Sequence, residues 1–202
     1  MAKTPFQDLD FLRNEISRYS KRAYDQGLIR GSGGNLSLRV PDDNGILVTP
    51  TDVSLGDVEP EAIILVNLDG EIIESPSNLR PSKETSFHLR VYHRSQVIRA
   101  VVHLHPPHAT AYANKGKPLP MITVSARAKL RHVPNVGCAP PGSDELCDLV
   151  SNGMESFPEA KAFLMKDHGI LTLGEDLRTA YYLAELVEET AQIAFIEGSI
   201  RG

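Results

Sequence analysis

The hydrophobic positions of the chain follow two periods, which predict different elements. Near the N-terminus, apolar side chains recur every three or four residues, the period of one helix face, and Gly27 supplies the stop. A second such face predicts a long helix from Leu177 to Ile196. The first face comprises Phe6, Leu9, Leu12, Ile16, Tyr19 and Ala23, and the second comprises Ala180, Leu183, Ala184, Val187, Ala191, Ala194 and Phe195.

Short runs rich in β-branched residues lie between these two helices and predict strands. NLSLRV, GILVT, AIILVNL and EIIE are separated by turn signals such as PDDNG, which is typical of a meander. Further along, VIRAVVHLH predicts a strand, and KAFLMKDHGILTL predicts two strands joined at residues 167–169. Shorter helices are predicted over residues 83–95 with Ser82 as N-cap, over residues 107–114, and after an N-cap at Ser143.

The order of these elements determines the predicted fold class. A helix is followed by a run of strands and then by mixed helices and strands, without strict βαβ alternation. This order predicts an α/β protein whose mixed, mostly antiparallel sheet is flanked by helices, rather than a doubly wound parallel sheet. No repeat or linker interrupts the sequence, so we expect a single domain over residues 1–202.

Composition and charge narrow the possible partners. The net charge is −5 and no Lys/Arg run is longer than a pair, which gives no electrostatic footprint for nucleic acid or an anionic membrane. The N-terminus lacks the apolar segment of a signal peptide and no stretch reaches the length of a membrane span, so we expect a cytoplasmic location. Cys138 and Cys147 form no metal or redox motif, and we expect both to be reduced.

The stretch AVVHLHPPHATAYA contains candidate metal ligands. Residues two apart on a strand share a face, so His103 and His105 are predicted to present their imidazoles side by side. Zinc binds imidazole nitrogens, and a catalytic zinc typically has three protein ligands and one open position. The alternative for this pair is two surface histidines on a half-exposed strand.

The third ligand is predicted from the positions of the remaining histidines. Two prolines after His105 end the strand and turn His108 away from the shared face. His168 lies where a strand breaks at Gly169, and we favour it over His108. The other three histidines, for which a structural or solvent-facing role is expected, are His88, His93 and His132.

Glu84 is the candidate acid/base residue, and its neighbours indicate an anion site. A carboxylate in the first turn of a helix is stabilised by the helix dipole, which is a purely structural reason for its presence. Lys83 is predicted at the same positive helix end, where a cation is disfavoured, and such violations often mark a site. Ser82, Lys83 and the free N–H groups of this turn are therefore predicted to bind a phosphate or a carboxylate.

The glycine-rich stretch RGSGGNLS predicts a second anion cradle. Backbone N–H groups around Gly34 can converge on an oxyanion, with the side-chain amide of Asn35 beside them. The alternative is a plain glycine turn between a helix and a strand. The stretch fits neither of the glycine-rich nucleotide motifs, so no nucleotide site is predicted.

Several motifs taken together resemble the class II aldolase family, which includes L-fuculose-1-phosphate aldolase and L-ribulose-5-phosphate 4-epimerase. The resemblance runs in register from Phe11 to Ile196. It implies a three-layer α/β/α domain, assembled as a homotetramer with active sites at subunit interfaces. The motifs that carry it are GSGGNLS, VTPTD, RPSKETSFH, AVVHLHPPHATAYA and LMKDHGILTLGEDLRTAYYLAELVEETAQ.

The same resemblance implies the site residues. It implies zinc, with Mn²⁺ or Co²⁺ as alternatives, held by His103, His105 and His168, and it places Glu84 at the position of the acid/base glutamate. The implied substrate is a phosphorylated keto sugar. Its phosphate-binding positions correspond to Gly34, Asn35, Thr51 and Ser82.

The implied reaction is carbon–carbon cleavage, and departures from the aldolase pattern leave alternatives open. An aldolase would release dihydroxyacetone phosphate and an aldehyde through a zinc-stabilised ene-diolate. Here, however, Lys83 replaces a serine, Asp52 replaces a glycine, and Val124 lies near the position of the aldolase's tyrosine acid. The motifs SKE, HLH and PPGSDEL also resemble the branch that decarboxylates 3-oxo-tetronate 4-phosphates, and Lys83 is a suitable partner for the carboxylate of such a substrate.

Two further alternatives belong to the same family. One is a sugar-phosphate 4-epimerase. The other is a metal-free, adducin-like binding module, which would have no need of three histidines and a glutamate in one constellation.

Overall fold

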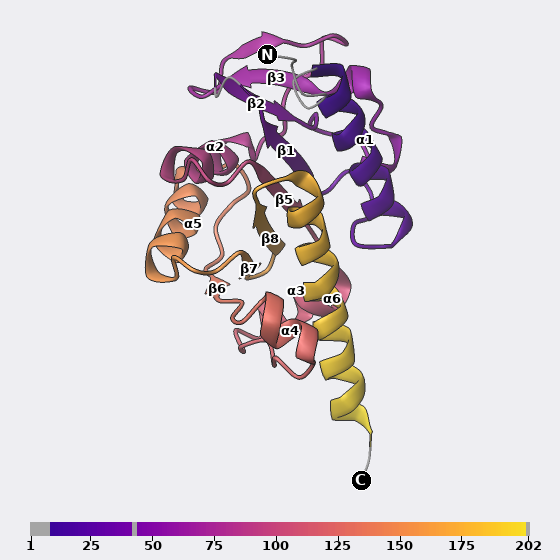
Figure 1. Ribbon diagram of the computed structural model, residues 1–202, viewed down its shortest axis with the longest axis vertical. Coiled ribbons are helices and arrows are strands. Elements are labelled where there is room, and N and C mark those ends of the chain that lie inside the picture. Colours follow the sequence, from indigo (N-terminus) through magenta and orange to yellow (C-terminus); the bar gives the residue numbers. More distant parts are fainter. Residues whose placement is uncertain (1–8, 42–43, 201–202) are drawn as a thin grey trace, which may run out of the picture.

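A sheet of eight strands forms the middle layer of the fold (Figure 1). The computed structural model describes residues 9–41 and 44–200, so the predicted helix start at Phe6 lies outside the described residues. The strand order is β4-β3-β2-β1-β5-β8-β7-β6, and only the β6–β7 pair is parallel, which confirms the predicted mixed, mostly antiparallel sheet. The strands are β1 (Asn35–Arg39), β2 (Gly45–Val48), β3 (Ile64–Asn67), β4 (Ile72–Glu74), β5 (Ala100–Leu104), β6 (Asn135–Val136), β7 (Ala162–Met165) and β8 (Gly169–Gly174).

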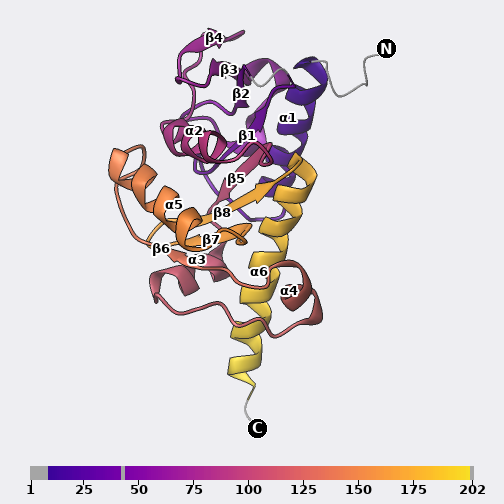
Figure 2. The ribbon, with the colours of Figure 1, turned by 60° about the vertical axis from the view of Figure 1, so that its left-hand side comes forward.

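Helices cover both faces of this sheet, so the predicted three-layer α/β/α arrangement is confirmed (Figures 1 and 2). One hydrophobic cluster joins the sheet to α1, α3, α4 and α6, and a second cluster joins the opposite face to α2 and α5. None of the helices among the described residues is long and apolar enough to cross a membrane. The helices are α1 (Leu9–Asp25), α2 (Thr85–Arg94), α3 (Pro107–Asn114), α4 (Val124–Lys129), α5 (Asp144–Ser156) and α6 (Leu177–Ser199).

Strand β5 lies at the centre of the sheet and separates the two clusters. Because side chains alternate along a strand, Val102 and Leu104 enter the cluster beneath α1 and α6, whereas Val101 enters the cluster beneath α2. His103 shares the face of Val101 and contacts the ring of Phe87 on α2, with centroids 5.6 Å apart. The strand thus delivers its one histidine to the α2 side of the sheet.

Helix α2 differs from its prediction at its start. It begins at Thr85, and the prediction that Ser82 is its N-cap is wrong, because Glu84 occupies that position without a side-chain capping bond. The Ser82 hydroxyl accepts a hydrogen bond from the Glu84 N–H at 3.3 Å, and its carbonyl accepts one from the Thr85 N–H at 3.0 Å. These bonds form a turn before the helix, so Lys83 precedes the helix instead of lying in its first turn.

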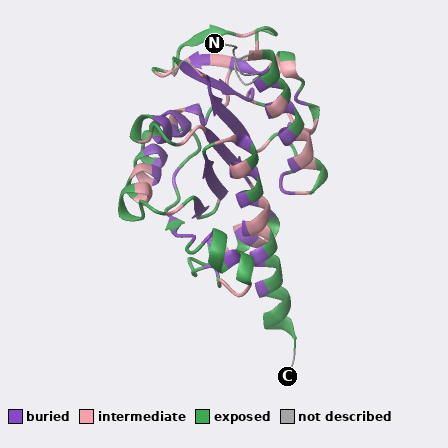
Figure 3. Cartoon of the chain, viewed as in Figure 1, coloured by how far each residue is buried: buried purple, intermediate pink, exposed green. Residues whose placement is uncertain are grey.

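Helix α6 differs from its prediction at its end. Its predicted apolar face is buried from Ala180 to Ala194, but Phe195 is 59% exposed and its predicted burial is wrong. The last turns of α6 extend beyond the sheet, where no layer covers them (Figures 1 and 3). The hydrophobic period therefore continues past the point at which the core ends.

Gly169 at the start of β8 provides a test of how closely the central strands pack. A Cβ atom at this position would overlap the carbonyl oxygen of Leu104 and lie 2.7 Å from Cδ2 of His105. We expect Gly169→Ala to lower the free energy of unfolding, measured with urea, by about 2–4 kcal/mol, because backbone must move. Gly198→Ala on α6, where no atom outside the helix's own neighbouring backbone lies within 4 Å, should leave it unchanged or raise it by up to about 1 kcal/mol. Equal stabilities of the two variants would contradict this packing.

Candidate metal centre

Three imidazoles converge where β5 ends. His103 lies in β5, His105 follows the strand, and His168 lies in the turn between β7 and β8. The Nε2 atom of His103 is 2.9 Å from that of His105 and 3.3 Å from that of His168. A tetrahedral ion with bonds of about 2.0–2.1 Å separates its ligand atoms by roughly 3.3 Å. The spacing of these nitrogens therefore fits a bound metal ion.

The hydrogen bonds around His103 support the same conclusion. Its Nδ1 atom lies 2.8 Å from the carbonyl oxygen of Ile170, and a carbonyl can only accept, so Nδ1 carries the proton. In the neutral ring, Nε2 then holds a lone pair that points at the other two imidazoles. A lone pair in this position is suited to bind a cation, and a backbone carbonyl is a common outer partner of a metal-bound histidine.

The β7–β8 turn holds His168 in place. Asp167 has the left-handed backbone conformation, with φ of 55°, and its N–H donates to Oδ1 of Asn114 at 2.9 Å. The N–H of His168 donates to the carbonyl of Met165 at 3.1 Å. The turn is thus tied both to its own strand and to α3, which fixes the direction of the imidazole.

Glu84 adds a carboxylate to the same centre. Its Oε2 is 3.3 Å from Nε2 of His103, and its Oε1 is 3.1 Å from Nε2 of His168. The side-chain amide of Asn35 donates to Oε2 at 2.8 Å. Glu84 can therefore touch both a bound metal and a ligand beside it, which is the position that an acid/base group requires.

The pKa shifts favour the protonation states that bind a metal. Burial lowers the pKa of His103 and lowers that of His105 to about 3, so both rings are neutral. Burial raises the pKa of Glu84, whereas attraction to His103 and His168 while these rings carry a proton, together with the hydrogen bond from Asn35, lowers it below its usual range. Neutral imidazoles and an ionised carboxylate are the forms in which these groups coordinate cations.

A cavity of about 200 Å³ opens beside the histidines. A β-bridge between Pro50 and Pro81 brings the segment after β2 next to the turn before α2. Gly34 has φ of 71°, and a Cβ atom there would lie 2.9 Å from the carbonyl oxygen of His103, so the glycine loop packs directly on β5. The predicted residues that line the cavity are Gly34, Asn35, Thr51, Ser82, Lys83, Glu84, His105 and His168.

Charges at the mouth of this cavity are partly paired. Nζ of Lys83 lies 3.8 Å from Oδ1 of Asp52, and both side chains are 69% exposed. The side chain of Asn35 is buried, and its oxygen and one amide hydrogen are used by neighbouring side chains. A bound anion would therefore find one exposed cation, Lys83, and only part of the hydrogen-bonding capacity of Asn35.

The remaining histidines lie outside the centre, although one of them, His88, is connected to it through Asn35, which the sequence did not reveal. Nδ1 of His108 lies 2.7 Å from Oε1 of Glu188, away from the cavity. His93 contacts the carbonyl of Leu68, and His132 packs on Phe157. His88, expected to be structural, is fully buried, and its Nε2 lies 2.6 Å from Oδ1 of Asn35. Asn35 in turn donates to Glu84, so a single side chain separates His88 from Glu84. The sequence signal for His88 was its spacing of four residues from Glu84, which places both on one face of α2 and its N-cap.

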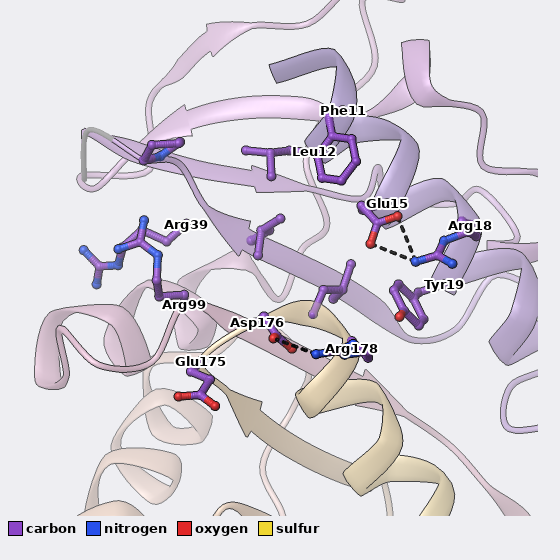
Figure 4. A pocket seen from close by; sticks show the side chains of 13 residues that line it. Phe11, Leu12, Glu15, Arg18, Tyr19, Arg39, Arg99, Glu175, Asp176 and Arg178 are labelled. Carbon is purple, nitrogen blue, oxygen red and sulfur yellow. Dashed lines mark hydrogen bonds and ion pairs between the residues drawn. The ribbon is translucent and has the colours of Figure 1, made fainter. Parts of the chain in front are cut away.

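A second cavity, of about 550 Å³, lies between α1 and the start of α6 (Figure 4). Its charged side chains include two pairs, Arg18 with Glu15 at 2.8 Å and Arg178 with Asp176 at 3.9 Å. None of the predicted site residues is among the described residues that line it. Size alone does not make this cavity the functional site, because the convergent titratable groups lie at the smaller one.

Comparison with known proteins adds a family to this geometry. The model of the Class II Aldolase and Adducin N-terminal domain matches residues 14–195. An L-fuculose phosphate aldolase of Methanococcus maripaludis is 36% identical over 187 residues, which cover 93% of this chain and 98% of that protein. A 3-oxo-tetronate 4-phosphate decarboxylase of Escherichia coli K12 is 35% identical over 192 residues, which cover 93% of this chain and 87% of that protein.

The same relationship is visible in three dimensions. The solved structure of an L-fuculose 1-phosphate aldolase superposes with a TM-score of 0.87 and 26% identity. The match covers 97% of this chain and 90% of that chain. The similarity thus extends over the whole layered fold, including the strands that carry the histidines.

The geometry of the three histidines predicts which substitution abolishes metal binding. We expect His105→Ala to lose stoichiometric zinc in elemental analysis and to weaken zinc by more than the ~10–100-fold that loss of an outer partner costs. His108→Ala removes an imidazole three residues away that faces Glu188, and it should keep one equivalent of zinc. Circular dichroism of both variants checks folding. A folded His105→Ala protein with full zinc content would overturn the ligand assignment.

Proposed function

The chain belongs to the class II aldolase and adducin family, and on this premise we propose that it is a metal-dependent carbon–carbon lyase acting on a phosphorylated keto sugar. The observation that carries the proposal is the convergence of three imidazole nitrogens and the Glu84 carboxylate beside a small cavity. We infer zinc as the metal, and aldol cleavage to dihydroxyacetone phosphate and an aldehyde as the reaction.

Recognition of the phosphate is assigned to the loops at the far side of the cavity. Gly34 exposes backbone, and Thr51 and Ser82 offer hydroxyl groups, which are suitable donors for a phosphate. Lys83 adds a positive charge at the mouth. Binding of the phosphate end would fix the reacting bond near the histidines, and such positioning lowers the barrier by making the reaction intramolecular.

The acid/base work is assigned to Glu84. A divalent metal held by His103, His105 and His168 would supply Lewis-acid polarisation of the ketone and stabilise the negative charge that bond cleavage leaves on oxygen. Glu84 would take and return the proton at the carbon or hydroxyl next to that oxygen, since its carboxylate faces the same centre. Its burial keeps bulk water away from the proton in transit.

Decarboxylation of a 3-oxo-tetronate 4-phosphate is the second candidate, because Lys83 lines the cavity. A β-keto acid has a carboxylate in addition to its phosphate, and an ammonium group is a fitting partner for it. The relative from Escherichia coli K12 that bears this name supports the candidate. Both reactions break a carbon–carbon bond next to a ketone and could use the same histidines and Glu84.

We also propose that the protein assembles as a homotetramer with active sites at subunit interfaces. Apolar side chains are exposed on α4 and on the last turns of α6, two helices that lie side by side. Exposed apolar side chains gathered on neighbouring helices are typical of association sites. The side chains concerned are Val124, Phe195, Ile196 and Ile200.

Proton exchange tests the proposed chemistry without knowledge of the full substrate. We expect the zinc-loaded protein to exchange the C3 hydroxymethyl proton of dihydroxyacetone phosphate with D₂O, followed as loss of its NMR signal. Glu84→Gln should slow the exchange by about 10²–10⁴-fold, because it removes the base. Glu159→Gln, at an exposed position before β7 and away from the cavity and from the proposed association surface, is the matched control and should leave the rate unchanged.

Each outcome of this experiment has a distinct meaning. Exchange that needs both zinc and Glu84 supports lyase chemistry, and a panel of ketose phosphates and β-keto acids then separates aldol cleavage from decarboxylation. Absence of exchange with zinc bound would refute the lyase and favour the 4-epimerase. Absence of both exchange and zinc would favour the adducin-like binding module.

Substitution of Lys83 is expected to affect the two candidate substrate classes differently. We expect Lys83→Ser to lower kcat/KM for 3-oxo-tetronate 4-phosphates by about 10–100-fold, which corresponds to loss of a hydrogen bond to a charged group. Ketose 1-phosphates should lose less than about threefold. Lys161→Ser, at an exposed position before β7, controls for the change of net charge. Equal losses for both substrate classes would remove the role of Lys83 as a carboxylate partner.

A further inference from the structure

A chain of buried hydrogen bonds leads from Glu84 into the interior between β1 and α2. Oε2 of Glu84 is 2.8 Å from Nδ2 of Asn35, and Oδ1 of Asn35 is 2.6 Å from Nε2 of His88. Nδ1 of His88 is 2.6 Å from Oγ of Ser37, which is 2.7 Å from the hydroxyl of Tyr92. The four residues beyond Glu84 are at most 2% exposed.

The spacing of these residues shows that two elements build the chain together. Glu84, His88 and Tyr92 follow one another at intervals of four, along one face of α2 and its N-cap. Asn35 and Ser37 are two apart on β1 and face the same helix. The chain thus fills a stretch of the helix–sheet interface beside the hydrophobic cluster of this face.

The charge on Glu84 fixes the direction of every bond in the chain. A carboxylate can only accept, so Asn35 turns its NH₂ group to Glu84 and its carbonyl to His88. That carbonyl can also only accept, so Nε2 of His88 carries the proton. Nδ1 of His88 must then accept from Ser37. Ser37 has given its only proton, so the Tyr92 hydroxyl donates to it.

The surroundings of the chain agree with this assignment. Burial lowers the pKa of His88 to about 3, which keeps the ring neutral, and raises the pKa of Tyr92, which keeps its hydroxyl protonated. The chain cannot conduct protons to Glu84, because an amide lies in the path and passes no proton without leaving its stable form. Its role is to orient.

We propose that His88 is a positioning residue that fixes the Glu84 carboxylate through Asn35. The N–H of His88 holds the Asn35 carbonyl, and this leaves the NH₂ group facing Glu84. Without that N–H, the amide can turn over and bring its oxygen against the carboxylate, where two acceptors repel. Glu84 would then leave the direction in which it faces the three histidines. The inference rests on the proposed role of Glu84 as acid/base group.

Two amide substitutions separate this role from simple packing. Gln at position 88 can place its NH₂ group near the former Nε2 and keep the donor to Asn35. Asn at position 88 is shorter and reaches only the place of Nδ1, so it keeps a partner for Ser37 and loses the donor to Asn35. Both variants bury one amide in the same space, and we expect similar melting temperatures and equal zinc content.

The exchange rate of dihydroxyacetone phosphate distinguishes the two variants. We expect His88→Gln to retain kcat within about threefold and His88→Asn to lose about 10–100-fold in kcat, the range typical of lost outer partners. KM should not change in either, because His88 touches no ligand. Equal kcat values for two folded, zinc-loaded variants would overturn the proposal. An inactive wild-type protein would instead refute the proposed function.

Nitrogen NMR tests the positioning role even without activity. In metal-free wild-type protein, the ¹⁵N signals of His88 should show the neutral Nε2–H tautomer. The side-chain NH₂ signals of Asn35 should stay at their wild-type positions in His88→Gln and move or broaden in His88→Asn. A His88 ring protonated on Nδ1, or Asn35 signals unchanged in both variants, would overturn the proposal whatever the protein catalyses.

Discussion

The hydrogen bond from Nδ1 of His103 to the carbonyl of Ile170 determines how the centre is built. It connects His103 of β5 to the neighbouring strand β8, and it leaves Nε2 of His103 facing the other two imidazoles. Antiparallel pairing makes this possible, because His103 lies opposite Leu171 on β8 and opposite Asn35 on β1. His103 therefore connects the cluster of imidazoles to both neighbouring strands, β8 and β1. A shift of either strand by one residue would turn these side chains to the other face.

The polar face of the site depends on apolar packing around it. Phe87 packs edge-on against His103, and α2 shares with this face of the sheet a cluster of aliphatic and aromatic side chains. In such surroundings an unpaired polar group is costly, whereas a fully paired network is rigid. This explains why the hydrogen bonds from Glu84 to Tyr92 form one continuous path. Rigidity suits the role proposed for Glu84, since an acid/base group must keep its direction while substrate and product exchange.

Local patterns in the sequence predicted the elements and the three convergent histidines. Both signals, the HLH pair on a strand and the histidine at a strand break before Gly169, depend only on residues that are neighbours in the sequence. What the sequence did not reveal depended on distant contacts. Glu84 is drawn towards Asn35, which lies 49 positions away, so the helix starts later than its capping pattern predicted. The sequence did not indicate a role for His88, because its partners are on β1. Phe195 continues the apolar face of its helix, but the helix extends beyond the core at that point, so the side chain is exposed.

The pairing of Lys83 with Asp52 connects the fold to the choice of substrate. Asp52 has the left-handed backbone conformation, with φ of 59°, directly after Thr51, so the turn that offers a hydroxyl to the cavity also directs a carboxylate to its mouth. Both charged side chains are largely exposed, and exposed pairs of this kind contribute only about 0–1 kcal/mol. A substrate carboxylate can therefore replace Asp52 beside Lys83 at little cost. For a substrate without a carboxylate, Asp52 neutralises the lysine and prevents an unbalanced charge at the entrance. Under either of the two proposed reactions, the weakness of this pair would leave Lys83 able to change partner, and selection between the substrate classes would fall to the groups that contact the rest of the substrate.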